Sequence, residues 1–279
     1  MIPFVVSRFF EEWNFNAGQS VNYNEGVKAA MNGLSNDLGC IQFIEVEEKD
    51  LASSKFENGL VFVPGNACVS MVGLAPGKSP GMSLQQAKMP SNILKWQGIT
   101  LSNNCAGTSM ATIQHEVLHA LGVMHEHSRP DRDTYLNFNA GNTQSQSSYT
   151  KIPSDEWVQS GIASEFEVES VMTYCSFCSA IVKSVPVLSL KDGRTFGSGT
   201  RVTTSDALQL QWNYCKPRGF EYKPYKECLS TDLLGFKRKV FTDRLCDGVK
   251  DCRDGEDETG EGAEWNCIPT GKTDKGSQN

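Results

Sequence analysis

Short apolar runs alternate with polar segments through the first hundred residues of the chain. The runs that predict β-strands lie at residues 2–6, 41–46, 60–63 and 99–101. Residues 21–38 place apolar side chains at helical spacing, which predicts a helix that ends at Gly39. Residues 76–90 are rich in glycine, proline and serine and predict an exposed loop. This region is therefore expected to combine several strands with at least one helix.

A second helix is predicted from about residue 109 onward, with Thr108 or Ser109 as its N-cap. Its apolar stripe consists of Met110, Ile113, Val117 and Leu121, with Leu118 beside it. The same segment carries the sequence H-E-x-x-H-x-x-G-x-x-H from His115 to His125. One element therefore combines a packing surface with a cluster of chemically active side chains.

The spacing of these histidines is typical of a catalytic metal site. His115 and His119 are four residues apart, so a helix places both rings on one face, about 6 Å apart along its axis. Gly122 can end the helix with a left-handed turn that delivers His125 as a third nitrogen ligand. Glu116 lies beside the first ligand, where it reaches a water on the ion without binding the metal. Three neutral imidazoles and one open position indicate catalytic zinc.

The alternative is an amphipathic core helix with incidental histidines. All four histidines of the chain, at positions 115, 119, 125 and 127, fall within this stretch. A chance match of five fixed positions has odds of roughly one in ten thousand in a chain of this length. The pattern therefore favours a zinc site.

Composition narrows the class of protein and its compartment. The net charge of −7 argues against a nucleic-acid partner, and no run of 18 apolar residues predicts a membrane span. Ten cysteines indicate disulfides in an oxidising compartment, and hence a secreted protein; the alternative is ten free thiols in the cytosol. Residues 1–6 do not form a signal peptide, so the chain resembles a fragment or a sequence that starts late.

The segment after the histidines predicts turns, loops and one short helix. Residues 126–133 form a dense charged turn, for which a salt-bridged lock beside the cleft is favoured over a solvated loop. Residues 137–148 are polar and predict a loop. Residues 206–214 predict a short helix that ends at Cys215.

Residues 115–133 resemble the extended signature of the astacin family of zinc metalloproteases, H-E-x-x-H-x-x-G-x-x-H-E-x-x-R-x-D-R-D. Every fixed position is matched, including Glu126, Arg129, Asp131, Arg132 and Asp133. The glutamate after the third histidine points to astacins within the metzincins. The resemblance covers roughly residues 1–215, as one catalytic domain. It implies a two-lobed α+β zincin, with a sheet and the zinc helix in the first lobe and a mostly irregular second lobe.

The resemblance also implies roles for residues outside the histidine pattern. Met172 would form the Met-turn, an apolar floor under the zinc, although an ordinary core methionine would look the same. Tyr174 would bind zinc and swing to the oxyanion of the transition state. The freed N-terminus of the family's members would be buried against Glu126. The signal peptide and the inhibitory pro-segment of the family are absent from the given chain. The implied disulfides of the catalytic domain are Cys40–Cys215 and Cys68–Cys105.

Two further features depart from the family pattern. Thr173 stands where the family has the histidine of Met-His-Tyr. Cys175 and Cys178 form a C-x-x-C, for which a local Cys175–Cys178 disulfide is expected. The alternative is a thioredoxin-like redox motif, which no flanking βαβ pattern supports.

The C-terminal region resembles the second half of an LDL-receptor class A module. The predicted boundaries are a linker at residues 216–227, the module at 228–267 and a disordered tail at 268–279. The implied calcium ligands are Asp247, Asp251, Asp257 and Glu258, and the implied disulfides are Cys228–Cys252 and Cys246–Cys267. Two of the usual six cysteines are missing, so calcium is expected to assist folding. The alternative is an acidic, solvated tail.

The sequence therefore predicts a secreted zinc endopeptidase that hydrolyses peptide bonds in protein substrates, with an appended module for an extracellular protein ligand. His115, His119 and His125 would hold one zinc ion, and Glu116 would act as general base on a zinc-activated water. Tyr174 would stabilise the oxyanion. The alternative is a catalytically inactive, protease-like protein used for extracellular binding or adhesion. The intact ligand set argues against it.

Overall fold

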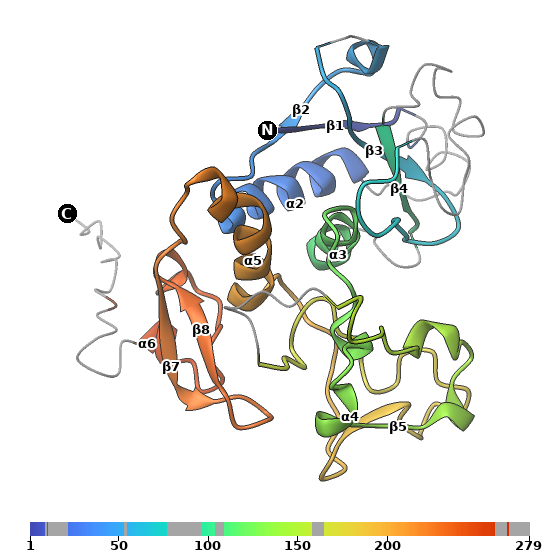
Figure 1. Cartoon of the computed structure of the whole chain (residues 1–279), viewed down its shortest axis with the longest axis vertical. Helices are drawn as coiled ribbons and strands as arrows, with labels where there is room; N and C mark the ends of the chain where they lie inside the picture. The colour runs from blue at the N-terminus through green and yellow to red at the C-terminus, as the bar shows by residue number, and fades with distance from the viewer. Residues whose placement is uncertain are drawn as a thin grey trace, which may run out of the picture. The chain divides into compact units, whose positions relative to one another are not determined.

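The structure is a computed structural model, and it describes residues 1–8, 10, 22–52, 55–76, 96–103, 109–157, 165–259 and 267. The chain divides into two compact units, Met1–Tyr222 and Lys223–Asn279 (Figure 1). Within the described ranges, the helices are too short or too polar to cross a membrane. The tail predicted at 268–279 and almost all of the loop predicted at 76–90 lie outside the described residues.

The first unit contains a four-stranded sheet in which every neighbouring pair is parallel. Its strands are β1 (Ile2–Val6), β2 (Phe43–Glu45), β3 (Gly59–Pro64) and β4 (Trp96–Leu101), in the order β2-β1-β3-β4. β3 and β4 are buried along their whole length, as parallel strands covered on both faces are. All four predicted strands are confirmed, although β2 is shorter than the apolar run 41–46 and β4 begins before residue 99.

Two helices, α2 (Tyr23–Leu38) and α3 (Met110–Ala120), pack against each other along the sheet (Figure 1). The predicted apolar stripe of α2 is buried. The helices approach closely at Gly33, where a Cβ would lie 2.9 Å from Nε2 of Gln114. Ser109 caps α3, as one of the two predicted N-caps. The helix that carries the histidines is therefore fixed in the core.

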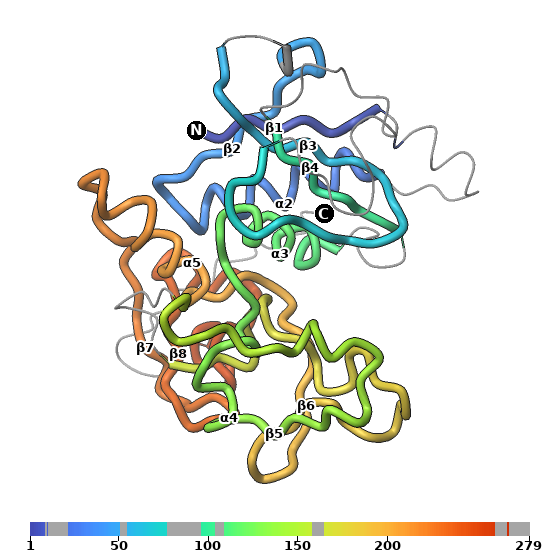
Figure 2. Tube along the Cα trace, turned by 45° about the vertical axis from the view of Figure 1, so that its right-hand side comes forward, coloured from blue at the N-terminus to red at the C-terminus, as the bar shows by residue number. Residues whose placement is uncertain are grey.

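The chain between α3 and the last helix of this unit contains little regular structure (Figure 2). Apart from short 3-10 turns, the regular elements among its described residues are α4 (Arg132–Tyr135) and the antiparallel strands β5 (Leu136–Phe138) and β6 (Leu188–Leu190). The prediction of a loop from residue 137 is wrong for the first two residues, which belong to β5. Its partner β6 lies far along the sequence, so no local pattern signals the pairing.

The helix α5 (Thr204–Leu210) returns the chain to α2. It begins two residues before the predicted position because Thr203 and Asp206 form a reciprocal capping box. The helical turn continues through Cys215, and the Gln211 amide donates to the carbonyl of Asp37 over 3.0 Å. α5 therefore joins the irregular half of the unit to the half that contains the sheet.

Disulfides reinforce both units. The bridges between described residues are Cys40–Cys215, Cys175–Cys178, Cys228–Cys252 and Cys246–Cys267. These are four of the five pairs expected from the sequence. Cys68 is also disulfide-bonded, and its expected partner Cys105 lies outside the described residues.

The second unit is small, and its described residues form an antiparallel hairpin, a short 3-10 helix (Thr242–Arg244) and one turn of α-helix. Its elements are β7 (Tyr225–Thr231), β8 (Lys237–Phe241) and α6 (Glu256–Thr259). Its buried cluster is Cys228, Val240 and Cys252, with Leu245 packed against it. A core this small depends on its disulfides. The predicted linker is too long, because Tyr225 already pairs with Phe241 in the hairpin.

Candidate metal centre

Three histidines converge at the C-terminal end of α3. His115 and His119 lie on successive turns of the helix, and Gly122 (φ +95°) turns the chain so that His125 reaches the same point. Nε2 of His119 is 3.2 Å from Nε2 of His125, which is 3.3 Å from Nε2 of His115. Within the described ranges, one other trio of His, Cys, Asp or Glu side chains is as compact, and it contains the Cys228–Cys252 disulfide.

Hydrogen bonds from the opposite ring nitrogens orient two of these imidazoles. Nδ1 of His115 lies 2.8 Å from the carbonyl of Val171, and Nδ1 of His119 lies 2.7 Å from that of Val123. A carbonyl only accepts, so each Nδ1 carries the proton and each Nε2 presents its lone pair. Burial lowers the pKa of all three imidazoles, that of His119 to about 3. The three rings are therefore neutral, as metal ligands must be.

The spacing of the nitrogens fits a tetrahedral zinc ion. Zn–N bonds of about 2.0–2.1 Å at tetrahedral angles place two ligand nitrogens about 3.3–3.4 Å apart. The observed separations of 3.2 and 3.3 Å agree with this value. Three imidazoles leave one coordination position open for water or substrate, as in catalytic rather than structural zinc sites.

Glu116 lies in the cavity that adjoins the histidines. The cavity has a volume of about 270 Å³, and its lining includes Ser70, Glu116, His119, His125, Ser148 and Tyr174. Burial raises the pKa of Glu116 to about 7, and a hydrogen bond from the Ser70 backbone opposes this rise. A carboxyl group with such a pKa exchanges protons readily at neutral pH.

Tyr174 lines the same cavity from the loop that follows Met172. Its ring centroid lies 4.7 Å from that of His125. Burial and the nearby Glu116 carboxyl raise the pKa of Tyr174. Its phenol therefore stays protonated and can donate a hydrogen bond to an oxygen that becomes negatively charged in the cavity.

The segment before Tyr174 is a buried turn that supports His115. Met172 is 1% exposed. The Ser170 hydroxyl and the Val171 N–H donate to the carboxylate of Asp206 over 2.6 and 3.3 Å. Since the carbonyl of Val171 accepts from His115, this short segment connects Asp206 on α5 to a predicted metal ligand.

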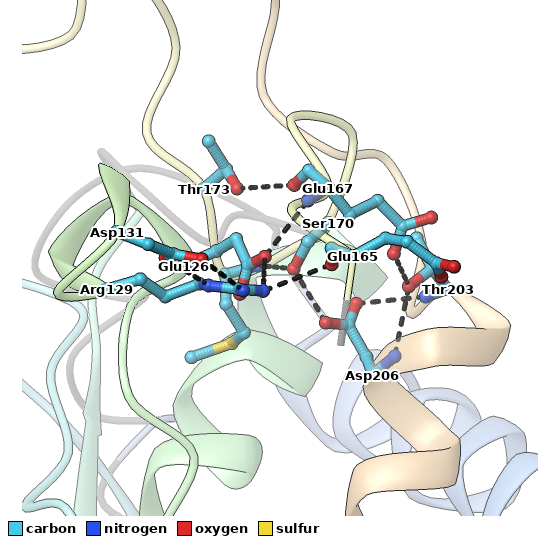
Figure 3. A network of polar contacts seen from close by, with 10 residues as sticks. Glu126, Arg129, Asp131, Glu165, Glu167, Ser170, Thr173, Thr203 and Asp206 are labelled. Atoms are coloured by element: carbon cyan, nitrogen blue, oxygen red, sulfur yellow. Dashed lines mark hydrogen bonds and ion pairs between the residues drawn. The ribbon is translucent and has the colours of Figure 1, made fainter. Parts of the chain in front are cut away.

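The charged turn after His125 contacts the segment before Tyr174 from the side opposite Asp206. Figure 3 shows Glu126 and Arg129 on one side of Ser170 and Asp206 on the other. Nη1 of Arg129 donates to Glu126 over 2.9 Å, and Nε and Nη2 bind both oxygens of Asp131. The Glu126 carboxylate also accepts the N–H of Glu167, while burial raises its pKa to about 7. This arrangement matches the salt-bridged lock predicted from the sequence.

The sequence of the first unit matches one protein-family model. The model describes Astacin, a peptidase family, and it covers residues 12–215, most of the chain.

The chain belongs to the astacin family.

Several relatives support this assignment. Zinc metalloproteinase nas-34 of Caenorhabditis elegans is 26% identical over 213 residues, which are 74% of this chain and 31% of the relative. Flavastacin of Elizabethkingia meningoseptica is 37% identical over 100 residues, which are 36% of this chain and 21% of the relative. The chain thus spans a third or less of the length of these relatives.

A solved structure shows the same fold. High choriolytic enzyme 1, a hatching enzyme zinc-protease from the medaka Oryzias latipes, superposes with a TM-score of 0.55 at 19% identity. The match covers 77% of this chain and 88% of the medaka chain. The first unit therefore has the astacin fold of mixed helix and sheet.

This astacin departs from the family pattern directly beside the cavity. Thr173 replaces the usual histidine, and its buried hydroxyl donates to the carbonyl of Glu167 over 3.0 Å. The C-x-x-C is a disulfide between Cys175 and Cys178. The hydrogen bond and the disulfide both restrain the loop that carries Tyr174.

The sequence of this astacin does not by itself identify two residues that support the site. It predicts Asp206 only as the start of a helix, although the T-x-x-D spacing with Thr203 signals a helix cap. His127 stands out only as the fourth histidine of the chain. It is fully buried and contacts Tyr174. The only feature of the sequence that could have indicated a role for His127 is its position two residues after His125.

The four acidic side chains predicted to bind calcium do not meet at one point. Asp257 accepts the N–H groups of Asp251 and Cys252 over 2.7 and 3.2 Å. Glu258 accepts those of Asp247 and Gly248 over 3.2 and 2.7 Å. The compact trios of possible ligands in the described part of the chain do not include these residues. Asp247 accepts the N–H of Val249 over 2.8 Å, so three of the four carboxylates bind the backbone of their own loop. The carboxylate of Asp251 instead lies 3.7 Å from the guanidinium of Arg244.

Proposed function

We propose that this chain is a secreted zinc metalloendopeptidase that cleaves peptide bonds in protein substrates. The observation that carries the proposal is the convergence of three imidazole Nε2 atoms beside the Glu116 carboxyl in one cavity. Membership of the astacin family supports it. The disulfides support an oxidising, extracellular compartment.

His115, His119 and His125 would hold the zinc ion. Bound zinc supplies a Lewis acid that polarises the peptide carbonyl and lowers the pKa of water to about 7. Glu116 takes a proton from the attacking water and delivers it to the leaving amine. The Tyr174 hydroxyl donates to the oxyanion that forms on the former carbonyl oxygen. Met172, which is buried, would supply the apolar floor beneath the ligands.

Zinc removal tests this proposal. We expect the folded chain to contain about one zinc ion and to cleave denatured protein, because catalysis depends on the ion. Dialysis against a strong chelator should abolish cleavage, and added Zn²⁺ should restore it. Metal content is measured by elemental analysis and cleavage by the release of peptide amines. A folded, zinc-loaded chain that cleaves neither denatured proteins nor a peptide library would instead support a binding or adhesion protein.

We further propose that residues 228–267 form a degenerate LDL-receptor class A module with an extracellular protein ligand. The bridges Cys228–Cys252 and Cys246–Cys267 support the resemblance, as does the acidic loop between them. Asp247, Asp257 and Glu258 would turn from the backbone, and Asp251 from Arg244, toward a Ca²⁺ ion. We expect weak binding, with a Kd on the order of 10⁻⁴ to 10⁻³ M, because the carboxylates must first give up these hydrogen bonds.

Calorimetric titration of the full chain with Ca²⁺ measures this binding. Asp247→Asn should weaken it at least tenfold, since the site loses a negative ligand. The exposed Asp192 in the first unit provides the matched control, and Asp192→Asn should leave binding unchanged. Equal binding by wild type and Asp247→Asn would exclude this calcium site.

A further inference from the structure

The fourth histidine of the cluster lies behind the proposed metal ligands. His127 belongs to the short turn Glu126–Ser128 and is 0% exposed. It is not one of the three histidines whose Nε2 atoms converge. A fully buried imidazole that binds no metal needs partners for both ring nitrogens.

Both nitrogens of His127 have such partners. The N–H of Tyr174 donates to Nδ1 over 3.1 Å. Nε2 lies 3.1 Å from the carbonyl of Ser148, which only accepts, so the proton of this ring is on Nε2. The ring therefore holds the backbone of Tyr174 with one nitrogen and the cavity wall at Ser148 with the other.

The ring of His127 also packs against both the proposed metal ligand His125 and Tyr174, whose rings contact each other as well. Its centroid lies 4.8 Å from that of His125, in a stacked arrangement, and 4.3 Å from that of Tyr174. Tyr149 covers a further side, with centroids 5.3 Å apart. The Arg132 guanidinium donates to the carbonyls of His127 and Tyr149. The imidazole is thus held in place independently of Tyr174.

We propose that His127 is a positioning residue that fixes Tyr174 relative to the ligand His125. This inference rests on the proposed peptidase function. The hydrogen bond from the Tyr174 N–H to Nδ1 sets the backbone from which the phenol enters the cavity. The stacked ring sets the distance between the phenol and the metal ligand. A displaced phenol would donate poorly to the oxyanion, so His127 acts on the rate through Tyr174.

Two conservative variants separate the roles of the two ring nitrogens. The side-chain oxygen of Asn in His127→Asn can occupy the place of Nδ1 and accept from Tyr174. The amide nitrogen of Gln in His127→Gln can occupy the place of Nε2 and donate to Ser148. The proposal therefore expects His127→Asn to preserve the position of Tyr174 and His127→Gln to lose it.

The first readout is the amide resonance of Tyr174 and does not depend on activity. The chain has seven tyrosines, so ¹⁵N-tyrosine labelling gives a simple spectrum in which Tyr174→Phe identifies the signal. We expect the Tyr174 amide proton to resonate downfield in wild type and His127→Asn and to move upfield in His127→Gln. An unchanged Tyr174 signal in both variants would overturn the proposed hydrogen bond.

The second readout is a kinetic double-mutant cycle on the zinc-loaded enzyme. His127→Gln should lower kcat roughly ten- to hundredfold with KM nearly unchanged, and His127→Asn should lower it less. In a Tyr174→Phe background, His127→Gln should have almost no further effect, because both changes remove the same contribution. Fully additive effects, or equal losses in Asn and Gln variants, would overturn the positioning role.

Two controls keep these outcomes separate from misfolding and from the proposed function. Zinc content and the thermal midpoint identify a variant that has not folded. In that case the milder Tyr174→Phe/His127→Asn pair completes the cycle. A wild-type chain without peptidase activity would contradict the proposed function, whereas the amide resonance would still decide the His127 contact.

Discussion

Replacing Glu116 by Gln is expected to abolish nearly all peptide cleavage and to leave the zinc in place. Glutamine keeps the size and hydrogen-bonding shape of the side chain, but its amide takes up no proton from water. A general base contributes about 10²–10⁴-fold, and in the proposed mechanism the same carboxyl also returns the proton to the leaving amine. We therefore expect kcat to fall by about 10⁴-fold.

Metal content and steady-state kinetics on the same sample check this result. Glu57→Gln is a matched control, because Glu57 is exposed, and it should keep wild-type kinetics and zinc. An active Glu116→Gln enzyme would show that another group accepts the proton. Loss of zinc in Glu116→Gln would assign Glu116 to the ligand set instead.

Replacing Arg129 by Met is expected to destabilise the first unit by about 3–5 kcal/mol. The Arg129 side chain is 4% exposed, and its guanidinium binds Glu126, Asp131 and the carbonyl of Glu165. It also lies over the ring of Phe166 at 5.3 Å. Methionine fills similar space but leaves the Glu126 carboxylate buried without its cation. For a unit of this size the thermal midpoint should fall by roughly 10 °C or more.

Denaturant titration followed by fluorescence or circular dichroism measures this loss. The double variant Glu126→Gln/Arg129→Met should recover part of the stability, because it removes the stranded charge as well. Arg194→Met is a control at an exposed ion pair, and its midpoint should stay close to wild type. A midpoint for Arg129→Met equal to that of the control would show that the network of Figure 3 contributes little to folding.

The parts of the fold and site that could be predicted follow local rules of spacing. A separation of four residues places His115 and His119 on one face of any α-helix. Gly122 signals the end of that helix, where the structure has a positive φ that favours glycine. Apolar runs likewise signal β1 and β3, since parallel strands buried on both faces lack polar positions.

The parts that could not be predicted depend on contacts between distant segments. Asp206 binds the backbone of Val171 and His127 binds that of Tyr174. No periodic pattern records which loop a buried polar side chain will meet. The pairing of β5 with β6 could not be predicted either. Each strand has three residues, which are too few for an alternation of apolar and polar positions to be recognised. In the acidic loop of the second unit, the order of carboxylates along the sequence resembles that of a calcium site. This order does not determine the direction in which each side chain points.

The all-parallel sheet also sets how the first unit reaches its native state. Its pairings join Ile2 to Phe43, Phe4 to Leu60 and Gly59 to Trp96, so none of the ladders between these four described strands is a hairpin. Each ladder closes a long loop before it gains any contact energy, and such topologies fold slowly. During that interval the apolar strands β3 and β4 are exposed to other chains. Refolding yield should therefore depend on protein concentration, with dilution favouring the monomer over aggregates.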